Sequence, residues 1–128
     1  MDINRRRPVR ITSKIMDRYE SEPENRVFTE KITKTDIPDT DYIEIAYNIL
    51  RRDVDYLGHM HNISYLDVAY DVMPEEYFNG PQFNFVSIEY RKELLKNDDV
   101  KTHFYKIDNG CIISLNTDKI NSVITLKY

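Results

Sequence analysis

The sequence predicts an α+β domain in which a helix packs against one face of an antiparallel β-sheet. Three observations support this fold class. Residues 42–51 alternate between apolar and polar side chains, as expected for a half-buried strand. Residues 63–77 carry apolar side chains at helical spacing. Beyond residue 81, alternating segments follow one another with only short turns between them, and strands joined by such turns pair antiparallel.

Length, charge and cysteine content narrow the class of protein. A chain of 128 residues suits one compact domain with a single core. Its formal net charge of −4 argues against a nucleic-acid binder, which would usually carry a basic face. No apolar run approaches the roughly 20 residues of a membrane-spanning helix, and the N-terminus lacks the apolar core of a secretion signal. Cys111 is the single cysteine, so no intrachain disulfide can form. We therefore expect a cytoplasmic protein with neither nucleic acid nor a membrane among its partners.

Residues 1–34 are predicted to form an N-terminal arm or linker. The stretch begins polar and basic, and Arg5-Arg-Arg7 is best explained as solvated. Residues 11–19 could form a short helix, because their apolar side chains fall on one side. Residues 26–34 are ambiguous and could hold one short strand. The domain itself is expected to cover residues 35–128.

The first half of this domain is predicted to contain a strand, a polar loop and a helix. The strand covers residues 42–51, and Gly58 permits a sharp change of direction after it. The helix is expected to begin near Asn62, because asparagine is a good N-cap residue. Pro74 is expected to break the helix before a short turn at residues 75–78. The apolar stripe of the helix is predicted to comprise Ile63, Leu66, Tyr70 and Met73, with Ala69 and Val72 beside it.

The second half is predicted to be four strands joined by turns. These strands are expected at residues 82–94, 100–107, 111–116 and 122–128. Asp108-Asn-Gly110 is a strong hairpin signal between two of them. The helix must then lie across one face of the sheet to bury its apolar stripe.

A polar cluster lies between the first strand and the helix. Residues 53–65 read Asp-Val-Asp-Tyr-Leu-Gly-His-Met-His-Asn-Ile-Ser-Tyr and combine two carboxylates, two imidazoles and an asparagine. A polar loop between a strand end and a helix start can direct side chains and free backbone N–H groups at a substrate. Asp53, Asp55, His59 and His61 also offer metal-ligand chemistry. No matched ligand spacing follows downstream, so no metal is expected.

Two segments of this sequence resemble the C-terminal half of the acyl-acyl-carrier-protein thioesterases. Residues 53–62 resemble the family's Asp-x-Asp-x-Asn-x-His-Val-Asn-Asn motif at the helix start. Ile88-Glu-Tyr-Arg-Lys-Glu93 resembles the Glu-Tyr-Arg-(Arg/Lys)-Glu segment on the following strand. Tyr65, Arg7-Pro-Val-Arg-Ile11 and Arg18-Tyr19 extend the likeness. The element order is that of the hot-dog fold, an antiparallel β-sheet wrapped around one long helix.

The resemblance implies an enzyme that hydrolyses fatty acyl thioesters, above all acyl-acyl-carrier-protein, and releases the free fatty acid without a cofactor. Asp55, His59 and Glu93 fall on positions that the family uses for catalysis. The residues expected to bind the substrate are Met60, His61, Asn62 and Tyr65.

The sequence departs from the family's motifs at three positions. Leu57 replaces the central asparagine of the first motif, and His61 replaces the first asparagine of its closing pair. Leu94 stands where a cysteine often follows the last glutamate. Members of the family normally have two hot-dog halves in one chain, and this sequence holds one.

Thioester hydrolysis needs a polarised carbonyl, an activated water and a proton for the leaving thiol. Unpaired N–H groups near residues 60–63, at the positive end of the helix dipole, would stabilise the oxyanion. Glu93 could activate the water, His59 could orient it or protonate the thiolate, and Asp55 could fix the imidazole tautomer. A mechanism through Cys111 is not expected, because Cys111 lies across a hairpin from the motif.

Each assignment has a structural alternative. Asp53 is expected to cap the loop or the helix rather than to act in catalysis. His59 could be an ordered loop histidine without a chemical role. Glu93 could form a surface ion pair with a neighbouring basic residue.

Three functions remain open from the sequence. The first is a hydrolase for acyl chains held on acyl carrier protein, acting as a homodimer or higher homo-oligomer that imitates the two-half arrangement. The second is a catalytically weak or partial domain that binds acyl thioesters or assembles with a partner. The third is an acyl-CoA thioesterase.

Overall fold

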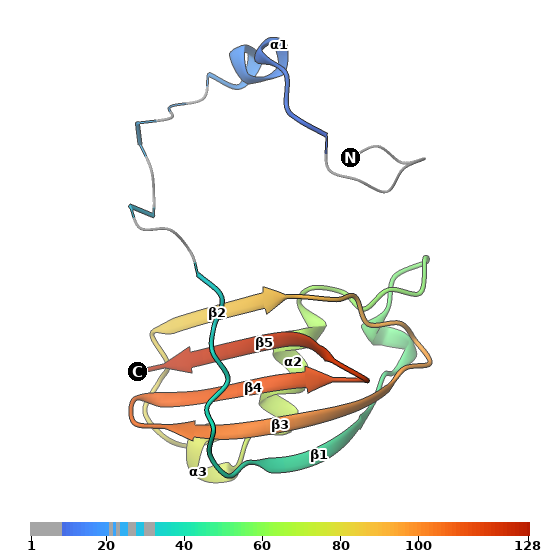
Figure 1. Cartoon of the computed structure of the whole chain (residues 1–128), viewed down its shortest axis with the longest axis vertical. Coiled ribbons are helices and arrows are strands. Elements are labelled where there is room, and N and C mark those ends of the chain that lie inside the picture. Colours follow the sequence, from blue (N-terminus) through green and yellow to red (C-terminus); the bar gives the residue numbers. More distant parts are fainter. Residues whose placement is uncertain (1–8, 21, 23, 26–27, 30–32) are drawn as a thin grey trace. The chain divides into compact units, whose positions relative to one another are not determined.

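The computed structural model describes residues 9–20, 22, 24–25, 28–29 and 33–128 (Figure 1). The chain divides into two compact units, Met1–Thr33 and Lys34–Tyr128. The first unit contains helix α1 (Ser13–Met16) and the 3-10 turn η1 (Asp17–Tyr19), within the stretch predicted to form a short helix. Of the ambiguous residues 26–34, the described ones form no strand, and the others lie outside the described residues.

The second unit is built on a five-stranded antiparallel sheet, which confirms the predicted α+β class. The sheet contains β1 (Ile43–Asn48), β2 (Phe85–Tyr90), β3 (Asp99–Ile107), β4 (Gly110–Asn116) and β5 (Ile120–Lys127). Its spatial order is β1-β3-β4-β5-β2, so β1 and β2 are the edge strands. All five predicted strands are present. The first ends earlier than expected, because the chain turns into η2 (Arg51–Asp53).

The helical segment is shorter than predicted and is interrupted. Helix α2 covers Ser64–Asp71, and α3 (Glu75–Phe78) follows Pro74, as expected for a proline that breaks the helix. The expectation of one long helix is therefore wrong in its length. The expectation that Asn62 caps this helix is also wrong, because Ile63 is the N-cap. The Ser64 amide donates to the His61 carbonyl, so a turn precedes the helix.

The buried face of α2 matches the predicted stripe in part, because Ala69, Val72 and Met73 are buried and Leu66 packs against the core. Ile63 and Tyr70 are 76% and 40% exposed. The side chains that the helix buries against the sheet are Tyr65, Val68, Ala69 and Val72. Ala69 and Val72 were part of the prediction, whereas Tyr65 and Val68 lie on the neighbouring side of the helix, so periodicity did not fix the centre of the buried face. Tyr70 instead packs edge-on against Phe78, with ring centroids 6.4 Å apart.

The main core lies between α2 and one face of the sheet. Alternate residues of the central strands supply it, among them Val100, Phe104, Ile113, Leu115, Ile124 and Leu126. Cys111 is also buried there, and burial raises the pKa of its thiol to about 12. A neutral, buried thiol is a poor nucleophile, which agrees with the expectation that Cys111 takes no part in chemistry.

The opposite face of the sheet is crossed by residues 34–41 (Figure 1). Ile37 packs there against a smaller apolar cluster of Tyr105, Ile112 and Val123. The Thr35 amide donates to Glu89 at 2.8 Å, and the Thr35 carbonyl accepts from the Arg91 guanidinium at 2.7 Å. These contacts fix the incoming chain to the end of β2. Among the described residues, we find no helix whose length and apolar character would let it cross a membrane.

Candidate active site

The first motif forms a tight hairpin rather than the start of the helix. Val54 and Met60 face each other in an antiparallel β-bridge, and the Asp55 amide donates to the His59 carbonyl at 2.8 Å. Gly58 closes the hairpin with a φ of +81°, which suits a residue without a side chain. The hairpin presents His59 from a second bridge, in which His59 pairs with Leu95.

Asp55 shapes this hairpin through its carboxylate. Its Oδ1 accepts hydrogen bonds from the amides of Leu57 at 2.8 Å and His59 at 3.0 Å. Both bonds lower the pKa of the Asp55 carboxyl below its usual value, and the bond from the His59 amide has the larger effect. Within the described residues, no hydrogen bond joins the Asp55 carboxylate to the His59 imidazole. Asp55 therefore positions the backbone that carries His59.

Asp53 is buried and caps the preceding turn, which confirms the structural role expected for it. Its Oδ2 accepts from the Leu50 amide at 2.7 Å and from the Tyr47 hydroxyl at 3.0 Å. Burial, and then the hydrogen bond to Asp53, raises the pKa of Tyr47 to about 12. These bonds close the connection between β1 and the hairpin.

The structure brings His59 and Glu93 together. The imidazole Nε2 lies 3.6 Å from the Glu93 carboxylate, although the two residues are 34 positions apart in the sequence and α2, α3 and β2 lie between them. The His59 side chain is 30% exposed and that of Glu93 59%. Both groups can therefore meet a molecule that enters from solvent. A carboxylate beside an imidazole can share protons with a reacting molecule placed between them.

Leu94, the next residue after Glu93, fixes the backbone beside this pair. Its side chain is fully buried, its amide donates to the Tyr65 hydroxyl at 3.3 Å, and its carbonyl accepts from the Met60 amide at 2.8 Å. Sequence reasoning noted Leu94 only as a departure from the family motif and missed this role. The pair of leucines, Leu94 and Leu95, directly after a candidate carboxylate in a polar segment was the available signal.

Of the backbone donors predicted at residues 60–63, two are paired and two are free within the described part of the chain. The Met60 and His61 amides are already used, by the carbonyls of Leu94 and Asp53 respectively. The expectation of free amides is therefore wrong for these two residues, because the hairpin pairs them. The amides of Asn62 and Ile63 donate to no protein acceptor in the described part of the chain.

A cleft of about 940 Å³ opens over these groups. All seven predicted site residues line it, namely Asp55, His59, Met60, His61, Asn62, Tyr65 and Glu93. His61 and Asn62 are exposed, whereas Met60 and Tyr65 are mostly buried in the core beneath. Tyr90 closes one side, because its hydroxyl donates to the Asn62 carbonyl at 3.0 Å.

Three basic side chains stand along the same cleft, and each has an acidic neighbour; that of Arg52 is Asp53, at 3.8 Å. Arg52, Arg91 and Lys92 line it together with the candidate pair. Arg91 is bound to Glu89 at 2.8 Å, and Lys92 to Asp118 at 3.1 Å. No group of three or more side chains suited to a metal ion occurs among the residues that the structure describes.

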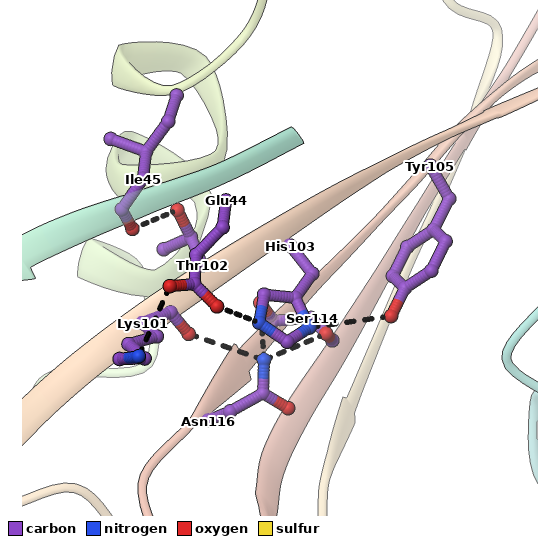
Figure 2. A network of polar contacts seen from close by, with 8 residues as sticks. All are labelled: Glu44, Ile45, Lys101, Thr102, His103, Tyr105, Ser114 and Asn116. Atoms are coloured by element: carbon purple, nitrogen blue, oxygen red, sulfur yellow. Dashed lines mark hydrogen bonds and ion pairs between the residues drawn. The ribbon is translucent and has the colours of Figure 1, made fainter. Parts of the chain in front are cut away.

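A second polar network lies on the outer face of the sheet, away from this cleft (Figure 2). Glu44 accepts from Lys101 at 3.0 Å and contacts the His103 imidazole at 2.9 Å. Tyr42 stacks on that imidazole, with centroids 4.1 Å apart. Ser114, which faces His103 from the next strand, is buried and cannot meet a substrate. The network joins the edge strand β1 to β3 and is structural.

This network predicts an acid-dependent loss of stability. Lys101 first, and His103 second, hold the pKa of Glu44 below its ordinary 4.5. Because the folded pKa is depressed, the stabilisation is present above pH 4.5 and is lost as the pH falls through the folded value. We expect Glu44→Gln to lower the melting temperature at pH 6 and the difference to vanish by about pH 3, with a smaller difference in high salt. A difference that stays constant down to pH 3 in thermal melts would contradict this role.

Comparison with known proteins now bears on this site. The model of the acyl-ACP thioesterase C-terminal domain matches residues 37–127. The chain belongs to that family. Oleoyl-acyl carrier protein thioesterase 2, chloroplastic, from Arabidopsis thaliana is 26% identical over 110 residues, which cover 78% of this chain and 30% of that protein.

Solved structures of thioesterases share the fold. The 12:0-ACP thioesterase from Umbellularia californica superposes with a TM-score of 0.71 at 14% identity, over 99% of this chain and 52% of that one. An acyl-ACP thioesterase from Bacteroides thetaiotaomicron gives a TM-score of 0.62 at 14% identity, over 77% of this chain and 41% of that one. These likenesses confirm the predicted hot-dog fold. The chain thus spans about half or less of these relatives.

Proposed function

We propose that this chain hydrolyses fatty acyl thioesters carried by acyl carrier protein and releases the free fatty acid. The observation that carries the proposal is the His59–Glu93 contact of 3.6 Å at an open cleft, in a chain of the acyl-ACP thioesterase family. The names of its relatives, an oleoyl- and a 12:0-acyl carrier protein thioesterase, support the same carrier.

The reaction would use the cleft residues in separate roles. Glu93 accepts a proton from a water molecule, and the resulting hydroxide attacks the thioester carbonyl carbon. The free amides of Asn62 and Ile63 stabilise the oxyanion that forms. His59 passes the proton that Glu93 took from water to the sulfur as the carbon–sulfur bond breaks, so that both groups return to their starting state. Asp55 acts indirectly, by holding the backbone of the hairpin that carries His59.

The substrate would be held by the walls of the same cleft. His61 and Asn62 contact the phosphopantetheine arm from the exposed rim, while Met60 and Tyr65 offer their few accessible atoms to its acyl end. Arg52 at the rim is suited to the acidic surface of a carrier protein.

We further propose that a second copy of the chain packs along β2. This strand is a sheet edge, and its Phe85, Val86 and Tyr90 side chains are exposed. An edge strand with exposed large apolar side chains favours pairing with another sheet. A homodimer would supply the second hot-dog half that the longer relatives carry in one chain. A cytoplasmic location stays a prediction, since the name of the plant relative refers to the chloroplast.

A specific observation favours the alternative of a weakly active or partial domain that only binds acyl thioesters. Leu57, which stands at the family's asparagine position, is exposed at the tip of the hairpin, where it supplies no hydrogen bond from its side chain. An acyl-CoA thioesterase is the other alternative, because the basic side chains at the cleft also suit the phosphates of CoA.

The 128-residue chain should be tested against matched acyl-ACP and acyl-CoA substrates of several acyl chain lengths, with release of the thiol as the readout. We expect turnover of acyl-ACP to exceed that of acyl-CoA, and His59→Ala to lower kcat by about 100-fold or more. His103→Ala is the matched control, because that histidine lies on the outer face of the sheet. Binding of acyl-ACP without turnover would support the partial-domain alternative, and faster hydrolysis of acyl-CoA would support the third function.

A further inference from the structure

Asn121 is the extra residue of a β-bulge near the start of β5. Leu115 of β4 pairs with Ser122, whereas the next residue, Asn116, pairs with Ile120, so Asn121 has no partner in the ladder. Its side chain is nevertheless fully buried. Bulges redirect side chains and are frequent beside active sites, which makes the contacts of Asn121 informative.

The side chain and the main chain of Asn121 join the β4–β5 turn to the segment that carries Glu93. On the turn side, the Asn121 Oδ1 accepts from the amide and the hydroxyl of Thr117, both at 2.9 Å. On the cleft side, the Asn121 carbonyl accepts from the amides of Arg91 at 2.8 Å and Lys92 at 3.0 Å. The Asn121 Nδ2 donates to the Glu93 carbonyl at 3.2 Å. Strand β2 has already ended there, so these bonds hold the segment beyond the ladder.

The Glu93 carboxylate depends on its backbone for its position. It is more than half exposed, and its recorded contact within the described chain is the one to His59. On its C-terminal side the backbone is anchored by Leu94, which is bound to Tyr65 and buried. Asn121 supplies the anchor for the other side. The Glu93 main chain is therefore held from two directions while its side chain extends into the cleft.

We propose that Asn121 is a positioning residue that keeps the Glu93 carboxylate within reach of His59. It does not line the cleft and would not touch the substrate. The inference rests on the proposed function, because it needs Glu93 to act in the reaction. An amide suits this position because it offers a donor to the Glu93 carbonyl and an acceptor to Thr117 at the same time.

Asn121→Asp tests the inference with little change of shape. The new carboxylate retains an acceptor for Thr117 but places a second oxygen against the Glu93 carbonyl, where a donor stood. We expect kcat toward acyl thioesters to fall by about tenfold with KM changed less than about twofold. Asn116→Asp is the matched control. Asn116 lies across the bulge, its side chain bonds to Lys101 and Ser114 among the residues described, and it does not line the cleft (Figure 2).

A double-mutant cycle with Glu93→Gln separates positioning from general stability. If Asn121 acts through Glu93, Asn121→Asp will lower kcat no further in the Glu93→Gln background. Equal losses in both backgrounds would overturn the inference while leaving the proposed function intact. A Glu93→Gln variant with normal kcat would instead overturn the proposed function itself, and the inference with it.

Asn121→Ser provides a second variant, since a buried carboxylate can prevent folding. The serine side chain is too short to bond both Thr117 and the Glu93 carbonyl. We expect Asn121→Ser to lower kcat by about the same factor as Asn121→Asp and to lower it no further in the Glu93→Gln background. Both measurements use protein that circular dichroism shows to be folded. If neither variant folds, Asn121 is required for the sheet itself, and the positioning role is overturned.

Discussion

Glu93→Gln is expected to lower kcat for acyl-thioester hydrolysis by at least about 100-fold, with a smaller effect on KM. Glutamine has nearly the shape of glutamate but cannot accept a proton from water. The Glu93 side chain is 59% exposed and has no buried partner, so the substitution should leave the fold intact. The measurement is steady-state release of thiol, with the melting temperature of each variant recorded beside it.

Glu44→Gln is the matched control for this experiment. It makes the same chemical change on the outer face of the sheet, where Glu44 contacts Lys101 and His103 (Figure 2). Near neutral pH we expect its kcat to stay within about twofold of the parent at a temperature well below its melting point. A Glu93→Gln protein that turned over substrate at the parental rate would remove Glu93 from the reaction and leave the contact with His59 as a surface ion pair.

Gly110→Ala is expected to destabilise the second unit by more than about 3 kcal/mol, enough to unfold a marginal domain. Gly110 follows the β3–β4 turn with a φ of +149°, which side chains rarely adopt. A Cβ built on it would lie 2.0 Å from the Leu126 carbonyl oxygen. That oxygen belongs to the backbone of β5 and cannot move without disturbing the ladder. Urea unfolding followed by circular dichroism would measure the loss.

Gly58→Ala measures the loss of stability caused by a positive φ alone, without the steric clash expected at Gly110. Gly58 has a φ of +81°, but nothing lies within 4 Å of a Cβ built on it. We expect a loss of about 1 kcal/mol, the ordinary cost of placing alanine in a left-handed conformation. If Gly58→Ala and Gly110→Ala lower the free energy of unfolding equally, the close approach of the Leu126 carbonyl to Gly110 contributes nothing to the loss of stability.

The hairpins were predictable because their signals are local. Alternation of side chains places each residue of β3, β4 and β5 on one face or the other, and Asp108-Asn-Gly110 specifies the turn between the first two. The break at Pro74 follows from the missing amide of proline. The buried face of α2 was predictable only in part. Ala69, Val72 and Met73 are buried as expected, but apolar residues almost surround this helix, and only the packing against the sheet shows that Tyr65 and Val68 are buried.

The site shows the same division between local and distant causes. The resemblance to a family identified His59 and Glu93, and the structure brings them together. The resemblance did not reveal that the Asp55 carboxylate accepts from backbone amides, or that the amides of Met60 and His61 already donate to backbone carbonyls. These contacts depend on how the hairpin at Gly58 folds and packs. Nothing in the sequence indicated that Asn121 contacts the site. Its contacts with Glu93 arise from a bulge on a strand far along the chain.

Leu94 belongs to the main core and is the neighbour of Glu93 in the chain. Its amide and carbonyl also hold Tyr65 and Met60, which form the floor of the cleft. Any loosening of the interior, by heat or by a distant substitution, is therefore transmitted to the Glu93 carboxylate. Turnover should accordingly decline on heating before the cooperative melt begins, which makes the rate of hydrolysis an early reporter of interior order.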